Sequence, residues 1–207
     1  ATQTLEDAGR VQAWVFGPGA GTGDDAAREL QWVLEQDVPV LVDADGLTLL
    51  TTHPDLRELV HGRSQATVLT PHDGEFERLC EAAGVGESDR MGETIALAQA
   101  LGCTVVRKGR VTVIAHEDDP HTAYAVDAGN SWAATPGSGD VLSGIIGAHL
   151  ALMQARSLGE EAALSGAVTV HALAAKLAAA TPFGDAAAPA SRIAAHIRPA
   201  TAAVAHA

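Results

Sequence analysis

The sequence predicts an α/β fold with a mainly parallel sheet, on three observations. Short apolar runs of strand length alternate along the chain with stretches of helical periodicity. The 207 residues are 47% hydrophobic but only 3% aromatic, so Ala, Val and Leu must fill most of the core, as in α/β proteins with Ala-rich helices. Glycines and carboxylates gather directly after the apolar runs, where open α/β sheets bind ligands. With no repeats and no linker between two cores, one domain over residues 1–207 is expected.

Apolar patterning and turn residues set the expected elements. Alternating strands and helices imply βαβ units. Residues 104–107 and 111–115 should form a hairpin through the turn at 108–110. The expected strands are 11–16, 38–42, 66–69, 104–107, 111–115 and 122–126. The expected helices are a first one with its apolar face over 27–34, then 47–51, 75–83, 91–100, 139–153, 162–180 and one within 191–204 that breaks at Pro199.

The composition excludes several function classes. The net charge is −13, and a protein that grips nucleic-acid phosphates needs a basic face, so no nucleic-acid partner is expected. No apolar run approaches the roughly 20 residues that span a bilayer, and no signal peptide is visible, so a cytoplasmic protein without membrane contact is expected. Cys80 and Cys103 lack metal or disulfide spacing and are expected to be reduced thiols. No pattern of metal ligands and no P-loop is present in the sequence.

The strongest local feature is the segment 137–140, Gly-Ser-Gly-Asp, which runs directly into the apolar helical stretch 141–151. Glycines at a helix start let backbone N–H groups approach an anion, and the helix N-terminus adds partial positive charge. Such a loop can stabilise charge on a phosphoryl group. A carboxylate repels phosphate, but Asp140 is suited to take a proton from a hydroxyl that attacks phosphorus. The alternative is that Asp140 is simply a favourable first-turn residue.

Two further loops carry candidate side chains. The 13 basic residues include only two lysines, and Lys108 precedes Gly109 in an expected turn, where a compact ammonium suits a nucleotide phosphate or ribose. His72 and Glu75 follow the expected strand 66–69 and suit substrate orientation or proton transfer. The alternatives are an ordinary exposed lysine, and a helix N-terminal box in which Glu75 caps and His72 is exposed.

Five motifs occur in order and together resemble the ADP-dependent NAD(P)H-hydrate dehydratase family, a branch of the ribokinase-like fold. The motifs are Gly17-Pro18-Gly19, Asp43-Ala44-Asp45, Thr70-Pro71-His72 with Gly74-Glu75-Phe76, Lys108-Gly109 with Thr112, and Gly137-Ser138-Gly139-Asp140 with Val141-Leu142-Ser143-Gly144. The resemblance covers essentially the whole chain. It implies a three-layer sandwich with a mainly parallel central sheet, and a single dehydratase domain over residues 1–207 that lacks its N-terminal strands.

By this resemblance the protein is a hydro-lyase of nicotinamide-nucleotide repair. It is expected to dehydrate (6S)-NADHX or NADPHX to NADH or NADPH, consuming ADP, with ATP as the alternative donor and Mg²⁺ as a charge partner without protein ligands of its own. Asp140 is the expected catalytic base and a substrate contact. The other expected substrate contacts are Gly19, Gly21 and His72. The expected nucleotide-binding residues are Lys108, Gly109, Arg110, Val111, Thr112, Gly137, Ser138 and Gly139.

Three positions depart from the residues that the family commonly carries: Ala20, Asp73 and Pro136. Asp73 is expected to add negative charge near the substrate, and Pro136 to stiffen the anion loop. The resemblance also implies a homo-oligomer, commonly a tetramer, and in many bacteria an epimerase domain before the dehydratase domain. Two other functions stay open: a small-molecule kinase of the same fold, which would share the anion loop, and a non-catalytic nucleotide-binding subunit. The sequence does not choose between NADHX and NADPHX.

Overall fold

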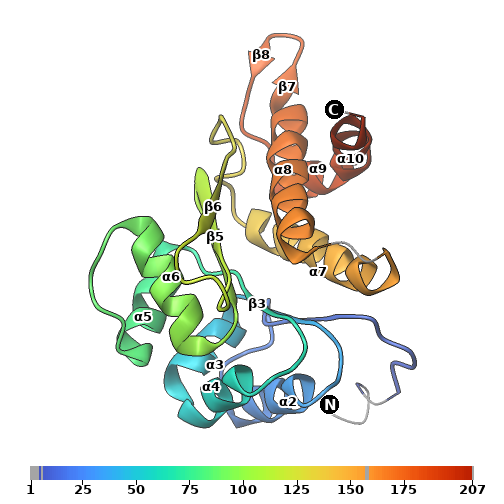
Figure 1. Cartoon of the computed structure of the whole chain (residues 1–207). Helices are drawn as coiled ribbons and strands as arrows, with labels where there is room; N and C mark the ends of the chain where they lie inside the picture. The colour runs from blue at the N-terminus through green and yellow to red at the C-terminus, as the bar shows by residue number, and fades with distance from the viewer. Residues whose placement is uncertain (1–4, 6, 157–158, 207) are drawn as a thin grey trace. The chain divides into compact units, whose positions relative to one another are not determined.

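The computed structural model describes residue 5, residues 7–156 and residues 159–206, drawn in Figure 1. The chain divides into two compact units. Unit 1 comprises Ala1–Gly109 and Val113–Tyr124, and unit 2 comprises Arg110–Thr112 and Ala125–Ala207. The assignment of the whole chain to one domain stays a prediction.

A six-stranded sheet has its strands in chain order, β1 to β6. The strands β1 to β4 run parallel, and β5 pairs antiparallel with β4, with Val105 opposite Ala115. The mainly parallel sheet and the hairpin around Gly109 are therefore confirmed, although the first three strands are shorter than expected. The bounds are β1 (Trp14–Phe16), β2 (Val40–Val42), β3 (Thr67–Leu69), β4 (Thr104–Arg107), β5 (Val111–Ala115) and β6 (Ala123–Asp127).

Five helices connect the strands of unit 1. They are α2 (Asp24–Leu34), α3 (Asp45–Thr52), α4 (Pro54–His61), α5 (Asp73–Ala83) and α6 (Arg90–Leu101). The sequence analysis did not predict α4. Its first residue is Pro54, which cannot continue α3 but suits the first position of a new helix, where no backbone N–H is needed.

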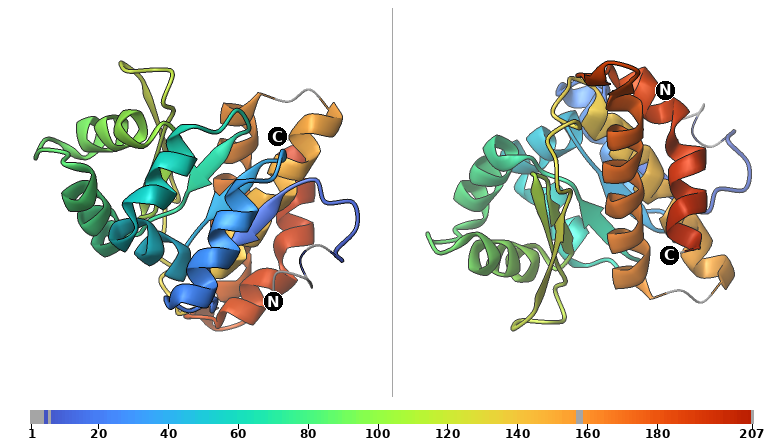
Figure 2. Two further views of the ribbon diagram at one scale, coloured as in Figure 1. Left: turned by 90° about the horizontal axis from the view of Figure 1, so that it is seen from below. Right: turned by 90° about the horizontal axis from the view of Figure 1, so that it is seen from above.

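The core of unit 1 follows the two-residue period of its strands. Val40, Val42, Leu69 and Val105 are buried in one apolar cluster with side chains of α2 to α6. The alternate residues of the same strands point to the opposite face of the sheet and are buried as well: Leu41, Val68 and Val106. Apolar residues on both faces of the strands are typical of a mainly parallel sheet in an α/β protein. Figure 2 shows the strands of unit 1 beside these helices.

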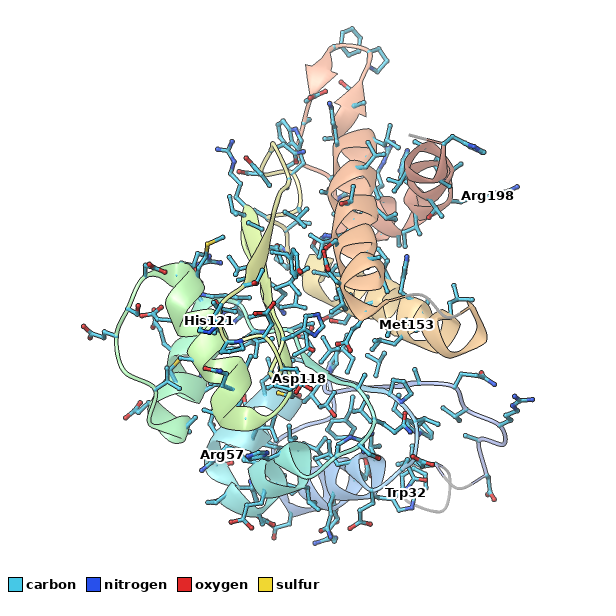
Figure 3. The ribbon with its side chains drawn as sticks, in the orientation of Figure 1. Trp32, Arg57, Asp118, His121, Met153 and Arg198 are labelled. Atoms are coloured by element: carbon cyan, nitrogen blue, oxygen red, sulfur yellow. The ribbon has the colours of Figure 1, made fainter. Side chains whose placement is uncertain are left out.

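Two tryptophans pack between β1 and α2. Trp32 of α2, labelled in Figure 3, meets the ring of Trp14 edge-on, with the ring centroids 5.7 Å apart. Edge-to-face pairs of this kind stabilise the fold by more than the burial of their apolar area alone. The pair fixes α2 against the first strand, and thereby the two ends of the glycine-rich loop that joins them.

Unit 2 is mainly helical. The helices α7 (Ser138–Arg156) and α8 (Glu160–Ala179) pack side by side, and α9 (Ala190–Ala195) and α10 (Ile197–Ala205) pack against α8. A short hairpin, β7 (Ala180–Thr181) with β8 (Gly184–Asp185), follows α8 and was not predicted. The expected break at Pro199 was wrong, because the helix is interrupted at His196 and Pro199 is the third residue of α10. A proline is tolerated in the first turn, where backbone N–H groups have no partner within the helix.

By length and composition alone, α8 could cross a membrane, and in this respect the expectation that no segment is long and apolar enough was wrong. Most of its apolar stretch is nevertheless buried inside the protein. The buried residues are largely alanines, whose small side chains let α7, α9 and α10 approach closely. Burial of this kind is what a core helix shows.

Candidate active-site loops

The carboxyl ends of the parallel strands in unit 1 carry the polar loops that the sequence placed there. Residues 17–23 follow β1, 43–45 follow β2, 70–72 follow β3 and 108–109 follow β4. Because β1 to β4 are parallel, these loops share one edge of the sheet. Of the predicted site residues, Gly19, Gly21, His72, Lys108 and Gly109 belong to unit 1, and the others belong to unit 2.

Lys108 is held by carboxylates at this edge. Its Nζ lies 2.6 Å from Oδ1 of Asp43 and 3.9 Å from Oε2 of Glu75. Asp43 is 1% exposed, and the backbone N–H of Lys108 donates to the carbonyl of Pro71 at 2.8 Å. The reading as an ordinary exposed turn lysine is therefore wrong. The ammonium lies beside two carboxylates that balance its charge. It can still donate a hydrogen bond to a ligand.

His72 caps helix α5. Its Nδ1 accepts from the backbone N–H groups of Gly74 and Glu75 at 3.0 and 3.4 Å, and Glu75 Oε2 accepts from the N–H of His72 at 2.8 Å. This is the reciprocal capping box that was left open as an alternative. The capping bonds use Nδ1, whereas Nε2 lies 3.4 Å from Glu75 Oε1 on a side chain that is 58% exposed. The substrate contact of His72 stays a prediction that this exposed edge of the ring allows.

The glycine-rich loop after β1 is tied to the loop after β2. The N–H of Gly21 donates to Oδ2 of Asp45 at 2.9 Å. Gly19 and Gly21 have positive φ, and a side chain at either position would meet open space. The predicted substrate contacts thus lie on exposed backbone that Asp45 holds in place. Ala44, between the two acids, has φ of 49°, which is unusual for a residue with a side chain.

Gly17 allows the loop after β1 to approach the loop after β2 closely. Its φ is 132°, and a Cβ there would lie 1.7 Å from the backbone oxygen of Asp43. Replacing Gly17 by Ala is expected to lower the free energy of unfolding by about 3 kcal/mol, because backbone must move to make room. Gly23→Ala in the same loop is the control, since its Cβ meets open space; its expected cost is within about 1 kcal/mol. Urea denaturation would measure both, and equal effects would contradict the packing argument.

Asp73 has a structural role and not the one expected. Arg90 Nη1 and Arg107 Nε lie 2.6 and 2.8 Å from its Oδ1, and Arg107 also donates to Glu93 at 2.8 Å. Burial opposes the charge of Asp73, but the hydrogen bonds from the two arginines outweigh it and lower the pKa of its carboxyl. Since its charge is compensated twice, Asp73 does not supply free negative charge for a substrate. Arg90 also donates to the carbonyl of Lys108 at 3.0 Å, which steadies the end of β4.

The segment 137–140 begins helix α7 in unit 2, one residue earlier than expected. The N–H of Ser138 donates to Thr135 and that of Val141 donates to Gly137. Gly139 and Asp140 lie in the first turn of α7, where backbone N–H groups have no partner within the helix. Asp140 is exposed and Gly139 half-buried, so two backbone donors and a carboxylate are accessible at a helix N-terminus. This arrangement suits an anion that binds to the N–H groups. It also suits a substrate hydroxyl beside the anion, whose proton the carboxylate can accept.

Ser138 turns its side chain away from solvent. It is 3% exposed, and its Oγ lies 2.9 Å from Nε2 of His171, a residue of α8 that is 7% exposed. The backbone N–H and the hydroxyl of Ser138 therefore both have partners inside unit 2. Its nucleotide contact stays a prediction, in which the side chain, buried beside His171, takes no direct part.

The remaining predicted nucleotide contacts lie on β5 and its turn. Arg110 and Val111 are exposed, and Arg110 Nε lies 3.8 Å from Oδ1 of Asp127. Thr112 is 4% exposed. Arg110 and Val111 are accessible to a ligand, whereas Thr112 is buried in the structure.

Sequence reasoning missed three side chains that hold these loops through hydrogen bonds. Asp43 binds Lys108, Asp45 binds the N–H of Gly21, and His171 binds Ser138. Asp43 and Asp45 stood in a quoted motif, but no spacing rule pairs them with partners that lie 65 and 24 positions away. His171 had only its place on an apolar helix as a signal, which favours a packed histidine.

The chain is similar to known proteins over most of its length. A family model described as NAD(P)H-hydrate dehydratase matches residues 1–198. The chain is 47% identical to the bifunctional NAD(P)H-hydrate repair enzyme Nnr of Corynebacterium glutamicum, over 99% of this chain and 39% of that protein. It is 40% identical to the ADP-dependent (S)-NAD(P)H-hydrate dehydratase of Neisseria meningitidis, over 68% of this chain and 48% of that protein. The chain thus spans less than half the length of these relatives.

A solved structure has the same fold. The ADP/ATP-dependent NAD(P)H-hydrate dehydratase of Bacillus subtilis, co-crystallised with ATP and Mg²⁺, superposes with a TM-score of 0.74 at 26% identity. The match covers 93% of this chain and 65% of that one. A ribokinase-like protein of Enterococcus faecalis matches at a TM-score of 0.75 and 24% identity, which supports the fold alone. The expected ribokinase-like architecture is confirmed.

Proposed function

The chain belongs to the NAD(P)H-hydrate dehydratase family, and on that premise we propose that it dehydrates (6S)-NADHX and NADPHX to NADH and NADPH with ADP as the phosphoryl donor. The observation that carries the proposal is the start of α7, where Gly139 and Asp140 present backbone N–H groups beside an exposed carboxylate. A carboxylate beside an anion site has little use in binding phosphate. It has a use when a hydroxyl must lose its proton to attack phosphorus.

The chemistry solves a leaving-group problem. Hydroxide leaves the hydrated ring poorly, whereas phosphate leaves well. Asp140 takes the proton of the ring hydroxyl, whose oxygen attacks the β-phosphorus of ADP as the bond to AMP breaks. The carbon–oxygen bond of the phosphorylated hydrate then breaks, pushed by the lone pair of the ring nitrogen. Loss of a proton from the neighbouring ring carbon completes NADH or NADPH, and AMP and phosphate are released.

The backbone of unit 2 stabilises the transferring charge in this proposal. The N–H groups of Gly139 and Asp140 and the N-terminus of α7 act on the phosphoryl oxygens. Gly137 has φ of 81°, a conformation that glycine adopts without strain, and it lets the loop turn into the helix. Arg110 and Val111, exposed on the turn into β5, contribute to holding the adenine nucleotide.

Unit 1 carries its own predicted contact residues. The exposed backbone of Gly19 and Gly21 and the Nε2 edge of His72 contact the hydrated nicotinamide nucleotide. Lys108 and Gly109 contact the adenine nucleotide, with the ammonium of Lys108 already oriented by Asp43. Because a carboxylate already balances the charge of this ammonium, its attraction for the charge of a phosphate is weaker. It therefore selects a ligand mainly by the position of the acceptor atom.

Mg²⁺ fits the reaction as a charge partner of the nucleotide. Among the residues that the structure describes, no group of three or more His, Cys, Asp or Glu side chains could hold a metal ion. The ion would therefore rest mainly on phosphate oxygens and water, as Mg²⁺ commonly does at nucleotides.

We also propose a cytoplasmic homo-oligomer and, since the chain spans under half of the bifunctional relative, an epimerase domain in the whole protein.

The test is recovery of reduced-nicotinamide absorbance when NADHX or NADPHX is mixed with the protein in its full natural length, ADP and Mg²⁺. Recovery that depends on ADP is the expected result, and parallel reactions with ATP determine the donor. Accumulation of a phosphorylated product without reduced nicotinamide would instead identify a kinase. Binding of ADP without turnover of any of these substrates would identify a nucleotide-binding subunit.

A further inference from the structure

His171 is a buried, titratable residue that the proposed reaction does not use. Its Nε2 lies 2.9 Å from the Oγ of Ser138, and both residues are more than nine-tenths buried. Ser138 is the first residue of α7, and His171 lies in the interior of α8. The two helices pack against each other within unit 2, and in Figure 1 α7 runs across the lower end of α8. The hydrogen bond therefore ties the start of one helix to the body of the other.

The place of Ser138 gives this bond its importance. Ser138 stands between Gly137 and Gly139, so it carries the single side chain that can anchor this stretch of the loop. Glycines leave the backbone many accessible conformations, and a loop that binds an anion through N–H groups needs one of them. A second hydroxyl helps on the helix side, where Ser143 Oγ donates to the carbonyl of Gly139 at 3.1 Å.

We propose that His171 is a positioning residue, which acts through Ser138 to fix the anion loop and the first turn of α7. The inference rests on the proposed function, in which the N–H groups of Gly139 and Asp140 stabilise the transferring phosphoryl group. Donors that are held in place before the reaction need no reorganisation during it. A displacement of about 1 Å in such a site can lower the rate about 100-fold.

Two substitutions of His171 separate its hydrogen bond from its volume. His171→Leu fills the space without a polar group and leaves Ser138 Oγ buried without this partner. His171→Gln places an amide near the position of Nε2, and an amide both donates and accepts, so the bond to Ser138 is kept whichever tautomer the histidine has. His149→Leu is the matched control, because His149 lies on α7, is half-buried, and bonds through Nδ1 to the carbonyl of Ile145 in its own helix.

The measurements are kcat and KM for dehydration of NADHX by ADP, and hydrogen–deuterium exchange in the peptide 135–142. We expect His171→Leu to lower kcat about 10- to 100-fold with KM for ADP within about threefold, because preorganisation acts mainly on the transition state. Exchange in the loop should become faster. His171→Gln and the control His149→Leu should stay near the wild type in both measurements.

The double variant Ser138→Ala, His171→Leu distinguishes positioning from mere stability. It leaves neither partner of the lost bond buried and unsatisfied, so its thermal stability should recover relative to His171→Leu. A kcat that stays low in this stable variant supports positioning, and a kcat that recovers with stability would overturn it. Unchanged loop exchange in His171→Leu would overturn it too. If the wild type dehydrates no substrate, the proposed function fails, and the exchange rates alone still decide whether His171 orders the loop.

Discussion

Replacing Asp140 by Asn is expected to lower kcat for NADHX dehydration about 10²- to 10⁴-fold, the usual contribution of a general base. The amide keeps the shape of the side chain but cannot take the proton of the ring hydroxyl. Asp140 is exposed at the start of α7, so the substitution should leave the fold intact. ADP should bind as well as before or better, because a negative charge beside the phosphates is removed.

The measurements are initial rates of reduced-nicotinamide formation and the dissociation constant of ADP by calorimetry. Asp185→Asn is the matched control, since Asp185 is exposed in β8 of the same unit and belongs to no proposed site. A kcat within about threefold of the wild type would remove Asp140 from the role of general base. Weakened ADP binding with unchanged kcat would instead make Asp140 a binding residue.

Replacing Lys108 by Met is expected to have the largest effect on stability. The substitution leaves Asp43, which is 1% exposed, without the ammonium that now lies 2.6 Å away. Removing one partner of a buried ion pair costs about 3 kcal/mol or more, because the remaining charge is poorly solvated. Lys176→Met is the natural control, because Lys176 is the other lysine of the chain and is exposed in the last turn of α8. Its cost should be within about 1 kcal/mol.

The double variant Asp43→Asn, Lys108→Met removes both charges and should regain most of the lost stability in guanidinium denaturation. Its activity then decides between two roles of Lys108. A stable but inactive double variant supports a direct contact of the ammonium with the nucleotide. A stable and active one would show that Lys108 serves only to neutralise Asp43. No regain of stability would contradict the ion-pair argument itself.

Particular elements show where sequence reasoning succeeded. The strands β4 and β5 and their hairpin were predicted at the observed bounds, because their apolar runs are flanked by a turn with glycine. The helix after Gly137 was also predicted, one residue late, from a glycine loop that runs into an apolar stretch. These signals are local: strand and helix periodicity, glycine and proline positions, and polar residues after strands. They suffice to place the loops at one edge of a parallel sheet.

Other elements failed for equally physical reasons. The helix α4 begins at Pro54 and was not predicted, although a proline suits the first position of a helix. A break in the last helical segment was placed at Pro199, although a proline is tolerated in a first turn. Asp73 was assigned to the substrate region from its place in a motif, whereas Arg90 and Arg107 bind it.

The sequence by itself determined the fold class, the family resemblance and the candidate base, because each depends on residues that are neighbours along the chain or that recur with a fixed period. Only the tertiary structure decided what the candidate side chains contact. Lys108 pairs with Asp43 across 65 positions, and Ser138 with His171 across 33. Such pairs depend on how strands and helices are placed against each other. The sum of many small packing contributions sets that placement, and no single local motif encodes it.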